Sequence, residues 1–119
     1  MKVLIVDDEP LVRRSLKRIL NKEGWLVEEA IDGLEGLQKW KSFQPDLVLL
    51  DVLMPGLSGP QVMENMKPET RGPSRVILMS AYTGDWNQDK TRELGADLFL
   101  AKPFENIFEV VNVIKKLVA

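Results

Sequence analysis

Three aspartates, a serine and a lysine close short apolar runs in this chain of 119 residues. Asp7 and Asp8 follow KVLIV, and Asp51 follows DLVLL. Ser80 ends VILMS, and Lys102 comes directly after DLFLA. Because the carboxyl ends of parallel strands meet at one rim of a sheet, this spacing would gather three carboxylates and one ammonium there. The pattern predicts a cation site with a counter-ion.

The chemistry of that cluster follows from the residue types. Neighbouring carboxylates repel one another at neutral pH and favour a bound cation. The chain has neither histidine nor cysteine, and oxygen ligands alone suit a hard ion such as Mg²⁺. The ion would neutralise an incoming phosphoryl group, and Lys102 would add a second positive charge. We therefore predict phosphoryl transfer to an aspartate nucleophile.

Each residue taken alone has a simpler explanation. Aspartates at strand ends often cap the following helix, and a serine such as Ser80 is often a turn residue. The placement of all of them at the same end of successive strands is what favours a functional site.

The composition narrows the class of protein. The chain is 45% hydrophobic and 29% charged with a net charge of -2, which is typical of a soluble globular domain and disfavours direct nucleic-acid binding. No apolar run approaches the roughly 20 residues that a membrane span needs. We expect a single domain over residues 1–119, located in the cytoplasm, with no membrane contact.

Apolar runs and amphipathic segments alternate along the chain. The runs lie near residues 2–7, 25–30, 46–51, 75–80 and 97–101. This alternation predicts an α/β fold with a parallel sheet, and the more polar run, WLVEEA, is expected at an edge.

The intervening segments predict five helices of unequal strength. The first should begin at Pro10 and end before Gly24, and the second should follow Asp32 as N-cap in spite of Gly33 and Gly36. A short helix is expected over 59–66, followed by a loop over 67–74, and a weakly held one over 84–94.

The last predicted helix carries an unusually wide apolar arc. Its core stripe is predicted to contain Phe104, Ile107, Phe108, Val111, Ile114 and Val118, extended by Val110, Val113 and Leu117. The arc spans roughly 220 degrees, more than burial against one sheet requires. Part of it is either an interface or a set of partly exposed side chains.

Four motifs in order resemble receiver domains of two-component response regulators: IVDDEP, LVLLDVLMPGLSG, SAYTGD and LAKPF. The resemblance covers essentially the whole chain. It implies a five-stranded parallel sheet of order 2-1-3-4-5 with five helices on two faces, the flavodoxin-like doubly wound receiver fold.

The resemblance also implies roles for the residues of the cluster. Asp51 would accept a phosphoryl group from a histidine kinase or a histidine phosphotransfer protein. Mg²⁺ would be bound by Asp8, by Asp51 and by the backbone carbonyl of Leu53, with Asp7 reaching it through water. Lys102 would pair with the phosphoryl oxygens, next to a cis bond to Pro103.

A switch is implied as well. Ser80 would hydrogen-bond to the phosphoryl oxygens on activation, and the ring of Phe99 would then move inward. Phe99 has no ring hydroxyl, so its two positions would differ by packing alone. Leu53 and Tyr82 border the route of a hydrolytic water, and we expect them to slow loss of the phosphoryl group.

As a member of that family, the chain would be a signalling phosphoacceptor that catalyses its own phosphorylation and dephosphorylation. It would signal through the helix over 84–94, the strand near 97–101 and the last helix. Its partner there would be a downstream effector protein, a fused output domain or a second copy in a homodimer. Whether it acts alone or within a longer protein stays open.

Three alternatives are less favoured. Aspartate-nucleophile phosphatases carry a second aspartate two residues after the nucleophile, where this chain has Leu53. A pseudo-receiver would lack part of the acidic set or Lys102. A flavin-binding domain would need a phosphate-cradling loop after the first strand, where this chain has Asp-Asp-Glu-Pro.

Overall fold

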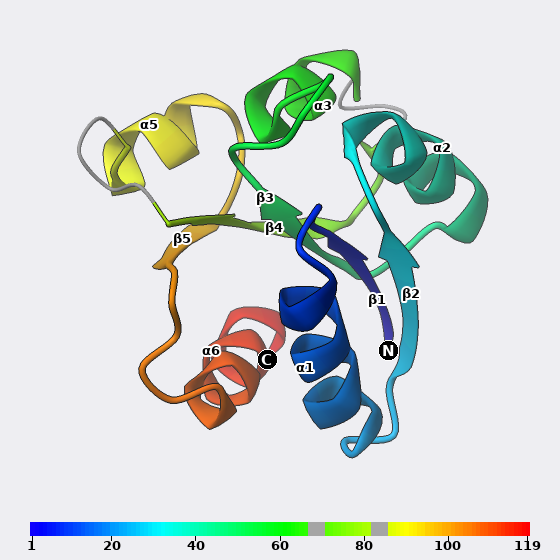
Figure 1. Cartoon of the computed structure of the whole chain (residues 1–119), viewed down its shortest axis with the longest axis vertical. Helices are drawn as coiled ribbons and strands as arrows, with labels where there is room; N and C mark the ends of the chain where they lie inside the picture. Colours follow the sequence, from blue (N-terminus) through cyan, green and yellow to red (C-terminus); the bar gives the residue numbers. More distant parts are fainter. Residues whose placement is uncertain (67–70, 82–85) are drawn as a thin grey trace.

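Five parallel strands form the centre of the computed structural model, which describes residues 1–66, 71–81 and 86–119 (Figure 1). The strands are β1 (Lys2–Val6), β2 (Leu26–Ala30), β3 (Leu47–Asp51), β4 (Arg75–Ser80) and β5 (Leu98–Ala101). They lie in the order β2-β1-β3-β4-β5, which confirms the order that the resemblance implied. The polar second strand is at an edge, where Leu26 is 62% exposed.

Helices cover both faces of the sheet (Figure 1). On one face lie α1 (Pro10–Asn21) and α6 (Phe108–Val118); on the other lie α2 (Gly33–Phe43), α3 (Gly59–Asn65) and α5 (Gln88–Glu93). Val3 and Ile5 of β1 pack toward α1 and α6, whereas Leu4 and Val6 pack toward α2 and α3. This alternation is expected of a strand buried on both sides. Within the described residues, no helix is long and apolar enough to cross a membrane.

The first two helices begin where the sequence predicts. Pro10 opens α1, and the chain turns after it at Gly24, which has φ +81°. Asp32 caps α2 by accepting a hydrogen bond from the backbone N–H of Glu35. The glycines of α2 are needed for close packing, because a Cβ on Gly36 would lie 2.6 Å from Cγ1 of Val6.

The later helices differ in part from the prediction. Asn87 caps α5, so this helix begins at Gln88, while residues 84 and 85 lie outside the described residues. The loop predicted over 67–74 also falls partly outside them.

The prediction that Phe108 and Val118 belong to the core stripe of α6 is wrong. Phe108 is 63% exposed and Val118 39% exposed, whereas Val110, Val111 and Ile114 are buried. Their chain neighbours Ile107 and Leu117 pack against the core, so both ends of the helix cover the sheet while Phe108 and Val118 lie outside the covered side.

Candidate functional site

The strand register brings the predicted polar residues to one rim. Val6 pairs with Leu50 and Ser80 pairs with Ala101, so the carboxyl ends of β1, β3, β4 and β5 lie side by side. The polar residues at these ends are buried: Asp7, Asp51, Ser80 and Lys102 are at most 7% exposed. Burial of so many polar groups requires mutual pairing.

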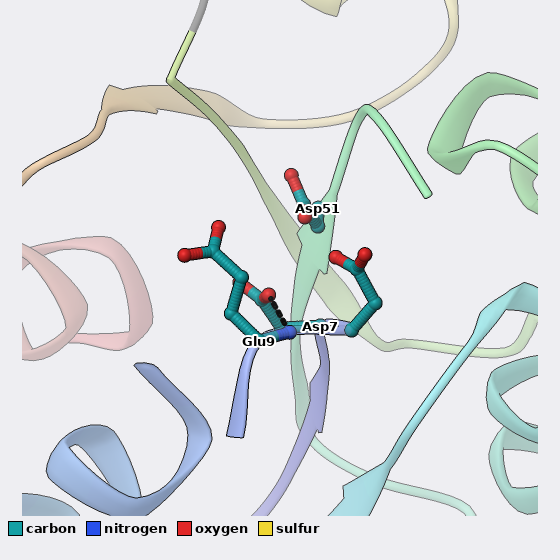
Figure 2. A group of neighbouring side chains, drawn as sticks. Asp7, Glu9 and Asp51 are labelled. Carbon is teal, nitrogen blue, oxygen red and sulfur yellow. Dashed lines mark hydrogen bonds between the residues drawn. The ribbon is translucent and has the colours of Figure 1, made fainter. Parts of the chain in front are cut away.

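Four carboxylates converge at the ends of β1 and β3. Asp7, Asp8, Glu9 and Asp51 each place one carboxylate oxygen within 4.8 Å of the others. Figure 2 shows Asp7, Glu9 and Asp51 as neighbouring side chains. The dashed line in it is the hydrogen bond of 2.9 Å from the backbone N–H of Glu9 to Oδ1 of Asp7. The cluster has the oxygen-only donors that Mg²⁺ prefers.

Glu9 is a member that sequence reasoning missed. It follows Asp8 directly, so its acidic side chain was a signal, but it lies three residues beyond the strand end. Its position before α1 turns the carboxylate back toward the cluster, where Oε1 accepts a hydrogen bond of 2.9 Å from Nζ of Lys102.

Lys102 is the cation of the cluster. Its Nζ also lies 2.9 Å from Oδ2 of Asp7 and 3.3 Å from Oδ2 of Asp51. Burial lowers the pKa of the Lys102 ammonium, but hydrogen bonds to Asp7 and Glu9 and the charge of Asp51 outweigh that effect and raise the pKa above the ordinary value. The bond to Pro103 is cis, as implied.

The negative charge of the buried Asp51 carboxylate is only partly offset by its neighbours. Burial and, to a smaller extent, the charge of Asp7 together raise the pKa of its carboxyl to about 7, although Lys102 opposes both effects. A single ammonium therefore does not balance the buried negative charge. A divalent cation would, so these residues fit the predicted metal.

The backbone around Asp51 is tightly packed. A Cβ on Gly59 would lie 2.4 Å from the carbonyl oxygen of Asp51. Gly59 donates its N–H to the carbonyl of Val52, and Ser58 and Gln61 form a capping box that begins α3. Leu53, between these fixed points, is 59% exposed. These contacts tie the start of α3 to the backbone next to the acceptor, while the Leu53 side chain faces solvent.

The remaining predicted residues lie around the cluster. Ser80 ends β4, and its carbonyl accepts a hydrogen bond of 2.8 Å from the backbone N–H of Lys102. Phe99 is half-buried and packs against the core cluster beneath α2 and α3. Tyr82 lies outside the described residues.

A hollow of about 320 Å³ opens beside Lys102. One wall is the start of α1, with Leu11 and Val12, and the opposite wall is the segment after β5, with Phe104 and Ile107. Its lining is mostly apolar and reaches the acidic cluster through Glu9.

Comparison with known proteins places these features in a family. Residues 3–115 match the response regulator receiver domain. The chain is 40% identical to sporulation initiation phosphotransferase F of Bacillus subtilis, covering 97% of this chain and 91% of that protein. It is 34% identical to protein PilG of Pseudomonas aeruginosa, covering 97% and 85%. It also matches the transcriptional regulatory protein CseB of Streptomyces coelicolor at 33% identity, over 93% of this chain and 47% of that protein.

Solved structures agree. Chemotaxis protein CheY4 of Vibrio cholerae superposes with a TM-score of 0.87 at 27% identity, covering 97% of this chain and 96% of that one. Response regulator TrrA of Thermotoga maritima, solved in complex with Mg²⁺ and BeF, gives a TM-score of 0.83 at 36% identity, covering 98% and 97%. The chain belongs to the response regulator receiver domain family.

Proposed function

We propose that Asp51 is the phosphoacceptor of this receiver domain. The observation that carries the proposal is the position of its buried carboxylate, 3.3 Å from the Lys102 ammonium and within the carboxylate cluster at the sheet rim. An Asp51 oxygen would form a bond to phosphorus as the bond from phosphorus to the donor nitrogen breaks. The electron pair of the broken bond leaves with the donor imidazole.

Mg²⁺ would be held by Asp8, Asp51 and the carbonyl of Leu53, with Asp7 bound through water. When bound, the ion supplies positive charge against the phosphoryl oxygens. The closeness of the four carboxylates and the chemistry of their oxygens support this assignment. That TrrA was solved with Mg²⁺ and BeF supports it by analogy.

Lys102 would contribute to transfer through its charge, since its ammonium already lies at the acceptor carboxylate. Ser80 would donate a hydrogen bond to the phosphoryl oxygens, and Phe99 would respond by moving inward. The domain would therefore catalyse its own phosphorylation and dephosphorylation. Residues 1–119 would form a single domain, located in the cytoplasm.

The phosphodonor would be a histidine kinase or a histidine phosphotransfer protein. The apolar hollow next to Lys102 supports docking of such a partner close to Asp51. The output would pass to an effector protein, a fused output domain or a second copy of the chain, through α5, β5 and α6. The chain spans about half of regulators such as CseB but nearly all of phosphotransferase F, so both arrangements have precedent among its relatives.

Intact mass spectrometry after incubation with Mg²⁺ and acetyl phosphate tests the proposal. We expect one phosphoryl adduct, absent in Asp51→Asn and absent when a chelator removes the metal. An adduct that persists in Asp51→Asn would place the acceptor elsewhere.

A further inference from the structure

The side-chain amide of Gln88 joins α5 to the edge of the sheet. Its Nε2 donates to the carbonyl oxygen of Asp97 at 3.0 Å, and its Oε1 accepts from the backbone N–H of Phe99 at 3.1 Å. β5 is the outermost strand next to β4, and edge strands leave backbone groups without a strand partner. One side chain thus supplies two hydrogen bonds of the kind that a neighbouring strand would make.

Polar contacts contribute much of what holds α5. Thr91 is the one buried residue of this six-residue helix, and its Oγ1 accepts a hydrogen bond of 3.0 Å from Nε1 of Trp86. Each such hydrogen bond contributes a net of about 1 kcal/mol. A modest change in free energy could therefore move α5 relative to β5.

Gln88 acts on the backbone of Phe99, the residue assigned to the switch. The Phe99 ring packs against the same core cluster as Trp86 and Leu94, which flank α5. A movement of the ring therefore changes the surface on which α5 rests. Both amide hydrogen bonds need the start of α5 at one position, because a displacement of about 1 Å would lengthen them beyond hydrogen-bonding distance.

Both amide hydrogen bonds of Gln88 are present in this structure. The Lys102 ammonium contacts the carboxylates of Asp7, Glu9 and Asp51, as expected before a phosphoryl group is present. A contact made in only one of two states disfavours any ligand that prefers the other state.

We propose that Gln88 is a positioning residue that latches α5 to β5 in the unphosphorylated domain and releases it when Asp51 is phosphorylated. This rests on the proposed function, because it takes phosphorylation at Asp51 as the trigger. The latch sets the balance between the two states without touching the reacting atoms.

The test replaces Gln88 with methionine, which keeps the chain length and helix propensity but removes the amide. Binding of beryllofluoride with Mg²⁺, which imitates an aspartyl phosphate, is followed by amide NMR. We expect Gln88→Met to bind up to about thirtyfold more tightly, the value of two lost hydrogen bonds of roughly 1 kcal/mol each. In the wild type, exchange of the Phe99 amide with solvent should accelerate on binding.

Gln38→Met on the exposed side of α2 is the matched control and should bind like the wild type. The affinity for beryllofluoride is measured on folded protein. A general loss of stability would leave that affinity unchanged, whereas loss of the latch would raise it. Equal or weaker binding by Gln88→Met, or unchanged Phe99 exchange, would overturn the latch alone. Failure of the wild type to bind beryllofluoride would overturn the proposed function and the latch with it.

Discussion

Nζ of Lys102 lies 3.3 Å from Oδ2 of Asp51, although Lys102 follows β5 and Asp51 ends β3, with β4 between them. The side chain spans the end of the intervening strand. It also reaches Asp7 at the end of β1. A single buried ammonium therefore links the ends of three strands and offsets the charge of the carboxylates that the chemistry requires.

Replacing Lys102 with methionine should destabilise the domain in metal-free buffer. The change leaves Asp7 and Asp51 buried without their cation, and removal of one partner from a buried ion pair costs about 3 kcal/mol. Urea denaturation in EDTA measures the loss, and Mg²⁺ should restore part of it because the carboxylates regain a counter-charge. Phosphorylation by acetyl phosphate should also slow.

Lys115→Met is the control for that experiment. It breaks the pair between Lys115 and Glu23, whose lysine side chain is 57% exposed, and should cost less than about 1 kcal/mol. A Lys102→Met variant no less stable than Lys115→Met would show that the buried ammonium is dispensable for the fold.

The raised pKa of Asp51 predicts that stability falls with rising pH in metal-free buffer. The folded carboxyl has a pKa of about 7, mainly because of burial, against an ordinary value of 3.8. Its contribution is fully present below pH 3.8 and is lost as the pH rises through 7, because the unfolded chain releases the proton first.

Asp51→Asn should remove this dependence, since its side chain does not titrate. At pH 8 in EDTA the variant should be more stable than the wild type by up to about 4 kcal/mol, the limit set by a shift of that size. Urea denaturation at pH 5 and pH 8 compares the two proteins. A wild type that is equally stable at both pH values, or more stable at pH 8, would contradict the prediction.

Gly36→Ala should destabilise the domain, although alanine favours a helix by about 1 kcal/mol over glycine. The new Cβ would lie 2.6 Å from Cγ1 of Val6, a fully buried residue, so α2 must move away from β1. We expect a net loss of about 1–3 kcal/mol, typical of overpacking. The double variant with Val6→Ala should lose less than the sum of the single changes, which a double-mutant cycle measures. Simple additivity would argue against the contact.

The fold could be predicted because both of its signals, the apolar periodicity and the acidic residues at strand ends, can be read from short stretches of sequence. Central strands such as LVLL are apolar on both faces, and the parallel register then fixes where Asp7 and Asp51 meet. Contacts between distant segments escaped prediction. Glu9 turns toward Lys102 only because β5 ends at the same rim of the sheet as β1 and β3. Gly36 is required because of Val6 on another element. Phe108 and Val118 of α6 were misjudged because the apolar arc is wider than the side that the sheet covers, so periodicity alone does not tell which side chains are buried.

Leu53→Asn should accelerate loss of the phosphoryl group from Asp51. Leu53 is 59% exposed two residues after the acceptor, and its apolar side chain offers no hydrogen bond to a water there. An asparagine amide could orient that water, worth roughly three- to tenfold in rate for one hydrogen bond of about 1 kcal/mol. Decay of purified phosphoprotein measures the rate, with exposed Leu11→Asn as the control. Rapid decay of the wild type that Leu53→Asn leaves unchanged would count against the shielding role.

Val113→Glu should weaken any dimer that forms on phosphorylation. Val113 borders a shallow apolar groove of about 440 Å³ between β5 and α6, together with Leu98, Leu100 and Leu117. A carboxylate placed at a contact between copies would be buried without a partner, which should reduce dimer affinity by at least about tenfold.

Analytical ultracentrifugation of the phosphorylated protein measures the dimer, and intact mass should show normal phosphorylation. Asn112→Glu, which adds the same charge at an exposed neighbouring position, should dimerise normally. Undiminished dimerisation in Val113→Glu would show that this groove is not the dimer interface. An interface there would have to bury the unpaired carboxylate, which would weaken it.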